Sequence, residues 1–264
     1  MDLRLREKLA LVSASTAGIG AAIAGGLARE GARVIVNGRS QERVDKAVAG
    51  IRARHPEAEL ESFPGDLSTP DAVRELTDRF PRVDILINNL GIFEPKPFTE
   101  ISDDDWRRFF EVNVLSGVRL SRFYFPKMLK AGWGRVIFIS SESALNIPVE
   151  MIHYGMTKTA QLAVSRGLAE LTAGTGVTVN SVLPGPTASE GITGFVRDLA
   201  AQGNQSVEEV EQQFFEKARP TNLLKRFAST EEVANMVVYL ASEAASATNG
   251  SALRVDGGTV KFII

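Results

Sequence analysis

The stretch Lys8-Leu-Ala-Leu-Val-Ser-Ala-Ser-Thr-Ala-Gly-Ile-Gly20 decides the fold of this chain. Its apolar first half is typical of a strand that is buried on both faces of a parallel sheet. The second half is a turn of small residues, followed by an alanine-rich helical pattern to Glu30 and then by the strand Arg33-Val-Ile-Val-Asn37. Small residues let a turn approach a pyrophosphate, which the N-terminus of the following helix attracts. The unit therefore predicts a dinucleotide site.

Outward from this unit, strands and helices alternate without a linker or a change of composition. Further strands are predicted over 58–63, 83–88, 135–139, 176–183 and 252–255, and helices over 41–54, 71–80, 102–130 and 230–241. This pattern predicts an α/β fold, a Rossmann-type doubly wound parallel sheet of about seven strands with helices on both faces. We expect a single domain over residues 1–264.

Residues 189–219 break the alternation with two polar, weakly amphipathic patches. The segment is interpreted as a helical excursion from the sheet that forms a substrate lid over about 190–219. Its glycines, Gly191, Gly194 and Gly203, predict that it is mobile without substrate. A partly apolar lid surface is expected from Phe195, Val196, Leu199, Phe214 and Phe215.

Composition excludes several classes of function. Lys plus Arg total 30 against 32 Asp plus Glu, so nothing favours nucleic acid or an anionic membrane as partner. The absence of cysteine excludes disulfides and thiolate catalysis, and two histidines are too few for a histidine-rich metal site. No apolar run is long enough to span a membrane, and Met1 leads into a core strand without a signal peptide. We expect a soluble, cytoplasmic protein without a metal.

A second signal lies near the middle of the chain. A strand ends there at Ser140 and Ser141, and the helical pattern after it carries Tyr154 and Lys158 four residues apart, on one face. An ammonium beside a phenol favours the phenolate and lowers the tyrosine pKa, while a serine hydroxyl can bind the same substrate oxygen. Such a pair also occurs by chance on many helices, so a structural pair is the alternative.

Residues 7–258 resemble the short-chain dehydrogenase/reductase family in its single-domain branch. Asn88-Asn-Leu-Gly91 resembles the family's Asn-Asn-Ala-Gly element, and Asn180 to Gly185 resembles its Asn-x-x-x-Pro-Gly element. The catalytic tetrad is matched, at the family's spacing, by Asn113, Ser141, Tyr154 and Lys158. The cofactor contacts that the resemblance implies are Ser13, Ser15, Thr16, Gly18, Ile19, Gly20, Arg39, Asp66, Leu67, Asn89, Gly91, Tyr154, Lys158, Pro184, Gly185, Thr187 and Ser189.

The resemblance implies an NAD(P)-dependent oxidoreductase that moves a hydride between a nicotinamide and a small carbonyl or alcohol substrate. Tyr154 is then the general acid or base, and Ser141 polarises the substrate oxygen. Lys158 holds the nicotinamide ribose and lowers the Tyr154 pKa, and Asn113 positions a water that links Lys158 to solvent. The alternatives are a catalytically silent dinucleotide sensor or scaffold, and a dehydratase or epimerase, whose usual separate substrate domain is not found.

Four positions depart from the family pattern. Ala14 replaces the first glycine of the turn, which costs stability if the backbone there needs positive φ. Leu90 places a larger side chain near the cofactor. Thr187 replaces an aliphatic residue, and Ser189 replaces a threonine but keeps its hydroxyl. None of these changes removes a catalytic group.

The choice of cofactor depends on Asn37-Gly-Arg-Ser40 at the end of the second strand. NAD-preferring relatives carry aspartate where this chain has Gly38, so no carboxylate repels a 2′-phosphate. The Arg39 guanidinium can contact that phosphate in a bidentate geometry, and Asn37 and Ser40 can add hydrogen bonds. NADP is therefore favoured over NAD. The alternative is that Arg39 begins a solvated loop.

Three further expectations concern packing. Ser102, with Asp105 three residues later, predicts a helix N-cap in preference to a metal site. His153 is expected at the surface or the substrate rim, because adjacent helical residues do not share a face with each other. The resemblance implies a homo-oligomer, a tetramer, and an apolar interface is expected from Phe109, Phe110, Phe123, Phe125 and the C-terminal Val260–Ile264.

Overall fold

Residues 2–203 and 205–263, which the computed structural model describes, contain a seven-stranded parallel sheet in the order β3-β2-β1-β4-β5-β6-β7. The strands are β1 (Leu9–Val12), β2 (Arg33–Gly38), β3 (Leu60–Pro64), β4 (Ile85–Asn88), β5 (Trp133–Ile139), β6 (Gly176–Pro184) and β7 (Ala252–Val255). The chain builds outward from β1 to β3, returns to the centre, and builds outward again from β4. Ligands of such sheets bind at this reversal, outside the carboxyl ends of the strands. The predicted doubly wound fold is confirmed.

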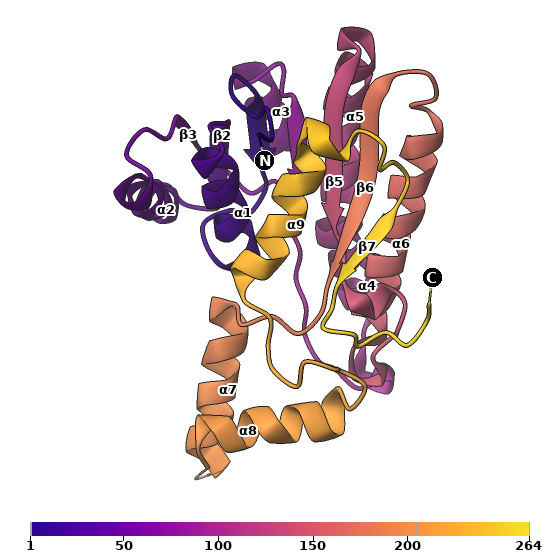
Figure 1. Ribbon diagram of the computed structural model, residues 1–264. Coiled ribbons are helices and arrows are strands. Elements are labelled where there is room, and N and C mark those ends of the chain that lie inside the picture. Colours follow the sequence, from indigo (N-terminus) through magenta and orange to yellow (C-terminus); the bar gives the residue numbers. More distant parts are fainter. Residues whose placement is uncertain (1, 204, 264) are drawn as a thin grey trace.

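Helices cover both faces of the sheet, because each strand sends alternate side chains to opposite sides. In β1, Ala10 and Val12 enter one core and Leu11 enters the other. The first core is covered by α1 (Gly18–Arg29), α2 (Gln41–Arg54) and α9 (Thr230–Ala241). The second core is covered by α3 (Pro70–Arg79), α5 (Ser116–Ala131) and α6 (Ile152–Glu170). Figure 1 shows α1 and α9 together on one side of the strands.

Two helix N-termini differ in whether a side chain caps their free backbone N–H groups. Ser102 and Asp105 form the predicted capping box at the start of α4 (Asp103–Phe110). Helix α1 differs, because Ala17 at its N-cap makes no side-chain capping hydrogen bond within the described residues. The amides that open α1 are therefore available to an anionic ligand.

The long helix predicted over 102–130 is interrupted. After α4, a π-helical turn, Glu111–Leu115, precedes α5. Such turns are frequent at functional sites, and this one carries the predicted catalytic residue Asn113, which is 1% exposed. Two residues expected at an oligomer interface, Phe109 and Phe125, are instead buried within the protomer, because their helix faces point to the core. Phe110 is exposed.

The segment predicted as a helical excursion is helical. Figure 1 shows α7 (Glu190–Gly203) and α8 (Val207–Gln213) set apart from both helical layers, and a π-turn, Phe214–Ala218, ends the segment. The predicted contributions of Phe195 and Leu199 to its surface lie outside the described residues.

The described side chains of α7 and α8 form a small apolar cluster of their own. Its buried residues are Val196, Ala200 and Val210. Phe214 and Phe215 pack against Phe227 at the C-terminal end of the excursion, which we call its root. The ring centroids are 5.0 to 5.1 Å apart. Segments that stand apart from the main core open more easily, so the mobility of this segment stays a prediction with a physical basis. Among the helices of residues 2–203 and 205–263, none has the length and apolar character of a membrane span.

Candidate active site

The turn between β1 and α1 depends on one strained residue and one close approach. Ala14 has φ +52°, in the left-handed region that favours glycine. The turn therefore needs positive φ at this position, and the methyl group costs on the order of 1 kcal/mol. A Cβ at Gly20 would lie 2.4 Å from the Ala14 carbonyl oxygen and 2.5 Å from Asn89 Nδ2. Glycine at position 20 thus lets the turn fold back onto α1.

Polar residues predicted as cofactor contacts brace this turn. Ser13 Oγ accepts hydrogen bonds from the backbone N–H groups of Asn89 at 2.9 Å and Leu90 at 3.0 Å, which joins β1 to β4. Ser15 Oγ donates to the Val12 carbonyl oxygen at 2.7 Å, and Asn89 Nδ2 donates to the Ser13 carbonyl oxygen at 2.9 Å. These side chains shape the cradle, and their contact with a cofactor stays a prediction.

The other departures from the family pattern are accommodated locally. Leu90 is partly buried, and its side chain packs against the second core. Thr187 is 5% exposed, and its Oγ1 donates to the Gly185 carbonyl oxygen at 2.9 Å. A Cβ at Gly18 would lie 3.4 Å from Ser189 Cβ, so the start of the excursion lies against the cofactor turn.

At the end of β2, Gly38 occupies the position whose side chain distinguishes NAD-binding from NADP-binding sites, and there is no room for a side chain there. A Cβ at Gly38 would lie 2.3 Å from Thr16 Cγ2, so aspartate does not fit beside Thr16. Arg39 follows and is exposed. Ser40 caps α2, with its Oγ accepting from the Arg43 N–H at 3.4 Å.

The expectation that Asn37 binds the 2′-phosphate is wrong. Asn37 is 2% exposed, and its Oδ1 accepts from the Ala14 N–H at 3.0 Å. Its Nδ2 donates to the carbonyl oxygens of Phe63 at 3.1 Å and Gly65 at 3.0 Å. Because three neighbouring strand ends meet here, this amide is used to join them and has no donor left for a ligand.

Asp66 and Leu67, expected near the adenine, follow β3. Asp66 Oδ1 accepts from the Ser68 N–H at 3.0 Å and from the Ser68 hydroxyl at 2.7 Å. Leu67 is 1% exposed and belongs to the second core. The loop is thereby held in one shape, and its contact with an adenine stays a prediction.

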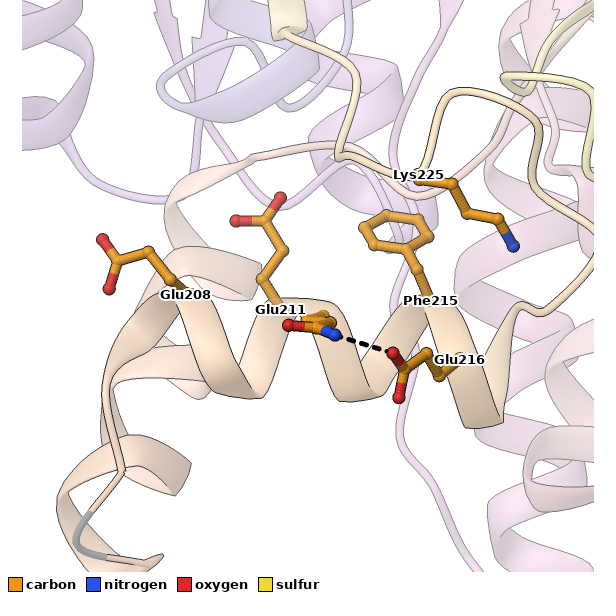
Figure 2. A pocket seen from close by; sticks show the side chains of 6 residues that line it. Glu208, Glu211, Phe215, Glu216 and Lys225 are labelled. Carbon is orange, nitrogen blue, oxygen red and sulfur yellow. Dashed lines mark hydrogen bonds between the residues drawn. The ribbon is translucent and has the colours of Figure 1, made fainter.

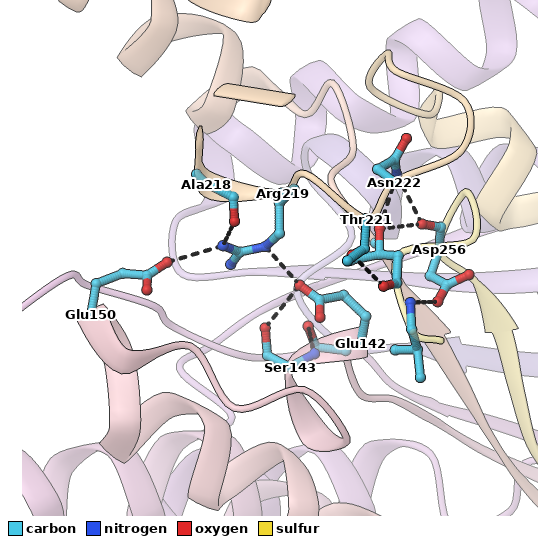
Figure 3. A network of polar contacts seen from close by, with 12 residues as sticks. Glu142, Ser143, Glu150, Ala218, Arg219, Thr221, Asn222 and Asp256 are labelled. Carbon is cyan, nitrogen blue, oxygen red and sulfur yellow. Dashed lines mark hydrogen bonds and ion pairs between the residues drawn. The ribbon is translucent and has the colours of Figure 1, made fainter. Parts of the chain in front are cut away.

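The end of β6 is fastened to the C-terminal loop. The strand ends at Pro184, and a Cβ at Gly185 would lie 2.6 Å from Asp256 Cα. The Asp256 carboxylate accepts from the Val260 N–H at 3.0 Å, and its carbonyl oxygen accepts from Asn222 Nδ2 at 3.1 Å, as Figure 3 shows. This fixes the backbone that would lie beside a nicotinamide.

The structure brings the predicted catalytic residues together from three elements. Ser141 follows β5, Tyr154 and Lys158 lie on α6, and Asn113 lies in the π-turn. Lys158 Nζ lies 5.6 Å from the Tyr154 ring centroid and donates to the Ile139 carbonyl oxygen at 2.9 Å. The group therefore surrounds the carboxyl ends of β4 and β5, next to the point where the strand order reverses.

Asn113 and Gly91 complete this group. Asn113 Oδ1 accepts from the Ile92 N–H at 2.8 Å, and its Nδ2 donates to Thr157 Oγ1 at 3.0 Å. A Cβ at Gly91 would lie 3.3 Å from Lys158 Nζ and 3.5 Å from Asn113 Oδ1. A side chain at position 91 would thus press on the ammonium, which explains glycine after β4.

Electrostatics at this group differ from the expectation. Burial raises the pKa of Tyr154 to about 12, although the Ser141 side chain acts in the opposite direction. Burial lowers the pKa of Lys158 to about 7. The expectation that Lys158 lowers the Tyr154 pKa is therefore wrong for the cofactor-free protein. The reason is geometric, since the ammonium is directed at the Ile139 carbonyl oxygen and is itself poorly solvated.

His153 is a core residue, and its expected surface position is wrong. It is fully buried, with its ring centroid 4.0 Å from that of Phe109 and 6.0 Å from that of Trp106. Neither ring nitrogen has a hydrogen-bond partner among the described residues, and burial lowers its pKa. Because α4 packs over the start of α6, the helix face opposite the site is covered and not solvated.

An ion pair that the sequence did not reveal joins the catalytic loop to the excursion. Arg219 Nε donates to Glu142 Oε1 at 3.0 Å, and its NH1 nitrogen donates to Glu150 Oε1 at 3.1 Å. Figure 3 shows the guanidinium between the two carboxylates. Glu142 directly follows Ser141, is 3% exposed, and has no partner for Oε2 among the described residues. The partners are 77 residues apart, so no local pattern could have paired them.

A depression on the excursion lies away from the predicted catalytic residues. Figure 2 shows its lining along α8 and the following turn, where Gln212 Nε2 donates to Glu216 Oε1 at 2.8 Å. Its lining residues are Glu208, Glu211, Gln212, Phe215, Glu216 and Lys225. None of the predicted catalytic or cofactor residues lines it. Within the described ranges, no cluster of three or more His, Cys, Asp or Glu side chains could hold a metal ion.

The fold and site define a class of protein. A family model described as enoyl-(acyl carrier protein) reductase matches residues 13–260. The chain therefore belongs to the short-chain dehydrogenase/reductase family, and it is an NAD(P)-dependent oxidoreductase.

Individual relatives cover the whole chain. The oxidoreductase YvaG of Bacillus subtilis is 49% identical over 263 residues, with 100% of both chains covered. The 3-oxoacyl-[acyl-carrier-protein] reductase FabG of Aquifex aeolicus is 36% identical, with 98% of this chain and 99% of the relative covered. The crystal structure of L-sorbose reductase from Gluconobacter frateurii, complexed with NADPH and L-sorbose, has a TM-score of 0.92 at 31% identity and full coverage of both chains.

Proposed function

We propose that this chain uses NADPH to reduce the carbonyl group of a small polar molecule, with Tyr154 as the proton donor. The observation that carries the proposal is the convergence of Ser141, Tyr154 and Lys158 at the carboxyl edge of the sheet. The dinucleotide cradle opens at the same edge, so a hydride donor and a proton donor can meet one substrate there.

The residues around the β1–α1 turn fit a dinucleotide. Ala17 leaves the N-terminus of α1 without a side-chain cap, and Gly20 removes the Cβ that would block the turn. A pyrophosphate would accept hydrogen bonds from these backbone amides. When bound, NADPH supplies the hydride.

The side chains of the protein supply the rest of the reaction. The Ser141 hydroxyl donates a hydrogen bond to the carbonyl oxygen and stabilises its developing charge. The Tyr154 phenol then gives that oxygen its proton, so that an alcohol forms. Lys158 binds the ribose hydroxyls beside Gly91 and, once so placed, favours the phenolate that Tyr154 leaves behind.

NADP is the proposed cofactor because the end of β2 offers a cation and no anion. Thr16 excludes a carboxylate from position 38, and Arg39 is exposed to meet a 2′-phosphate. The L-sorbose reductase with TM-score 0.92 was solved with NADPH, which supports this assignment.

A polyhydroxylated carbonyl compound is the proposed substrate class. Glu142 directly follows Ser141 and pairs with Arg219 at 3.0 Å, so charged groups lie close to the reacting position. The structurally similar reductase binds L-sorbose, a ketose. Following NADPH absorbance with ketoses, acyl thioesters and apolar ketones of matched size tests the class, and a preference for apolar ketones would contradict it.

Tyr154→Phe tests the catalytic assignment. Loss of the phenol hydroxyl removes the proton donor, so kcat should fall by a factor on the order of 10² or more. NADPH affinity, measured by fluorescence titration, should stay nearly unchanged. Near-normal turnover in this variant would overturn the assignment.

We further propose a cytoplasmic homotetramer. Apolar side chains that remain exposed on the protomer support self-association, among them Phe110 at 38%, Phe262 at 61% and Ile263 at 96%. Ile264 lies outside the described residues. Light scattering at micromolar concentration measures the assembly, and a monomer would contradict it.

A further inference from the structure

A buried glutamine lies between two of the catalytic residues. Gln161 is one turn after Lys158 on α6 and is 2% exposed. Its Nε2 donates to the Asn113 backbone carbonyl oxygen at 2.5 Å, and its Oε1 accepts from Lys158 Nζ at 3.4 Å. One side chain thus connects the π-turn to the ammonium.

The orientation of this amide is set by its surroundings. The Asn113 carbonyl oxygen can only accept, and the Lys158 ammonium can only donate. If Oε1 and Nε2 were exchanged, a carbonyl would face a carbonyl and an NH₂ group would face an ammonium. The amide therefore has one favourable orientation, with its oxygen toward Lys158.

The ammonium depends on this oxygen because it has few alternatives. Lys158 is 4% exposed, and within the described residues its Nζ has two hydrogen-bond acceptors, Gln161 Oε1 and the Ile139 carbonyl oxygen. Burial alone accounts for its lowered pKa, and no charged side chain from β5, α6 or the π-turn contributes to it. An acceptor that is lost from such a site cannot easily be replaced by water.

We propose that Gln161 is a positioning residue for catalysis, whose amide links the Lys158 ammonium to the Asn113 carbonyl oxygen. The inference rests on the proposed role of Lys158 in the reductase reaction. The amide holds the ammonium in place and favours its charged form. An amide does not pass protons along a hydrogen-bonded chain, so Gln161 positions Lys158 and does not itself transfer a proton.

Gln161→Leu removes both hydrogen bonds at similar volume. In cofactor-free protein labelled with ¹³C at lysine Cε, the Lys158 pKa should fall by about one unit, because the charged form loses an acceptor. NADPH should bind roughly tenfold more weakly and kcat should fall roughly tenfold. The alkaline limb of the pH–rate profile should move to lower pH, since Lys158 loses its charge earlier. Ser165→Ala, a buried change on the same helix, should alter none of these quantities.

Gln161→Glu is a second variant that tests the same proposal. It restores an acceptor for Lys158 and adds a negative charge, so the Lys158 pKa should rise above that of wild type even if the Leu variant fails to fold. An unshifted Lys158 titration in the variants that fold would overturn the proposal. This titration needs no substrate, so it tests the role of Gln161 independently of activity. If the wild-type protein reduced no carbonyl compound, that result would refute the proposed function and leave the titration test of Gln161 intact.

Discussion

The carboxyl edge of the sheet and the excursion of α7 and α8 are stabilised in opposite ways. At the edge, the predicted catalytic side chains come from buried elements, and the side chains of Lys158 and Asn113 each form hydrogen bonds with two other residues. Among the side chains that the structure describes, the excursion has a small apolar cluster of Val196, Ala200 and Val210, and it is attached near its ends, by Ser189 beside Gly18 and by Arg219 beside Glu142. The contrast predicts a rigid reaction centre and a segment that can adapt to a substrate.

Hydrogen exchange gives the largest expected contrast between the two regions. In substrate-free protein, amides of α7 and α8 should exchange through openings that cost roughly 3 kcal/mol less than those of β1, β4 and β5, because the two helices stand apart from the layers that cover the sheet. Exchange measured by mass spectrometry resolves the segments. Equal protection in both regions would remove the distinction and the idea of a mobile lid.

Arg219→Ala tests the attachment at the root. It leaves the buried Glu142 without its cation, which should destabilise the root by about 3 kcal/mol and speed exchange in α8. Burial raises the Glu142 pKa while Arg219 lowers it, so the variant carboxyl takes up a proton at higher pH. Protonated Glu142 needs no cation, and the loss of stability relative to wild type should therefore shrink as pH falls.

The matched control is Arg219→Met combined with Glu142→Gln, which removes both charges and should recover much of the stability. If Arg219→Ala unfolds at the wild-type urea concentration at every pH, the ion pair does not hold the root.

Arg39→Ala tests recognition at the edge of the sheet. NADPH binding should weaken roughly 10- to 100-fold, because a charged hydrogen bond to the 2′-phosphate is lost, while NADH binding should change little. Fluorescence titration of both cofactors measures this. Equal losses for both, or a wild-type preference for NADH, would show that the choice is made elsewhere.

Ala14→Gly should give the smallest effect. Removing the methyl group relieves the left-handed backbone at φ +52°, and stability should rise by about 0.5–1 kcal/mol once the greater freedom of unfolded glycine is included. Urea denaturation measures the change. A destabilised Gly variant would mean that Ala14 is not strained, and Ala22→Gly within α1 provides a control that should lose stability.

Local sequence patterns predicted most of the elements and missed contacts that depend on packing. The bounds of α2 and α9 agree with the predicted 41–54 and 230–241, since apolar spacing and a capping serine mark each helix. The interruption at Glu111–Leu115 was missed because its periodicity still reads as helical. The same limit explains His153, whose burial is decided by α4 and not by its own helix.

The sequence by itself determined the alternation of strands and helices, the small-residue turn and the spacing of Ser141, Tyr154 and Lys158. These features are local, because a helical face or a strand end follows from residues a few positions apart. Tertiary structure alone decided that Thr16 fills the space beside Gly38, that Arg219 meets Glu142 and that Gln161 meets the Asn113 carbonyl oxygen. Those partners lie on different elements, so their contact depends on how the packed layers bring distant segments together.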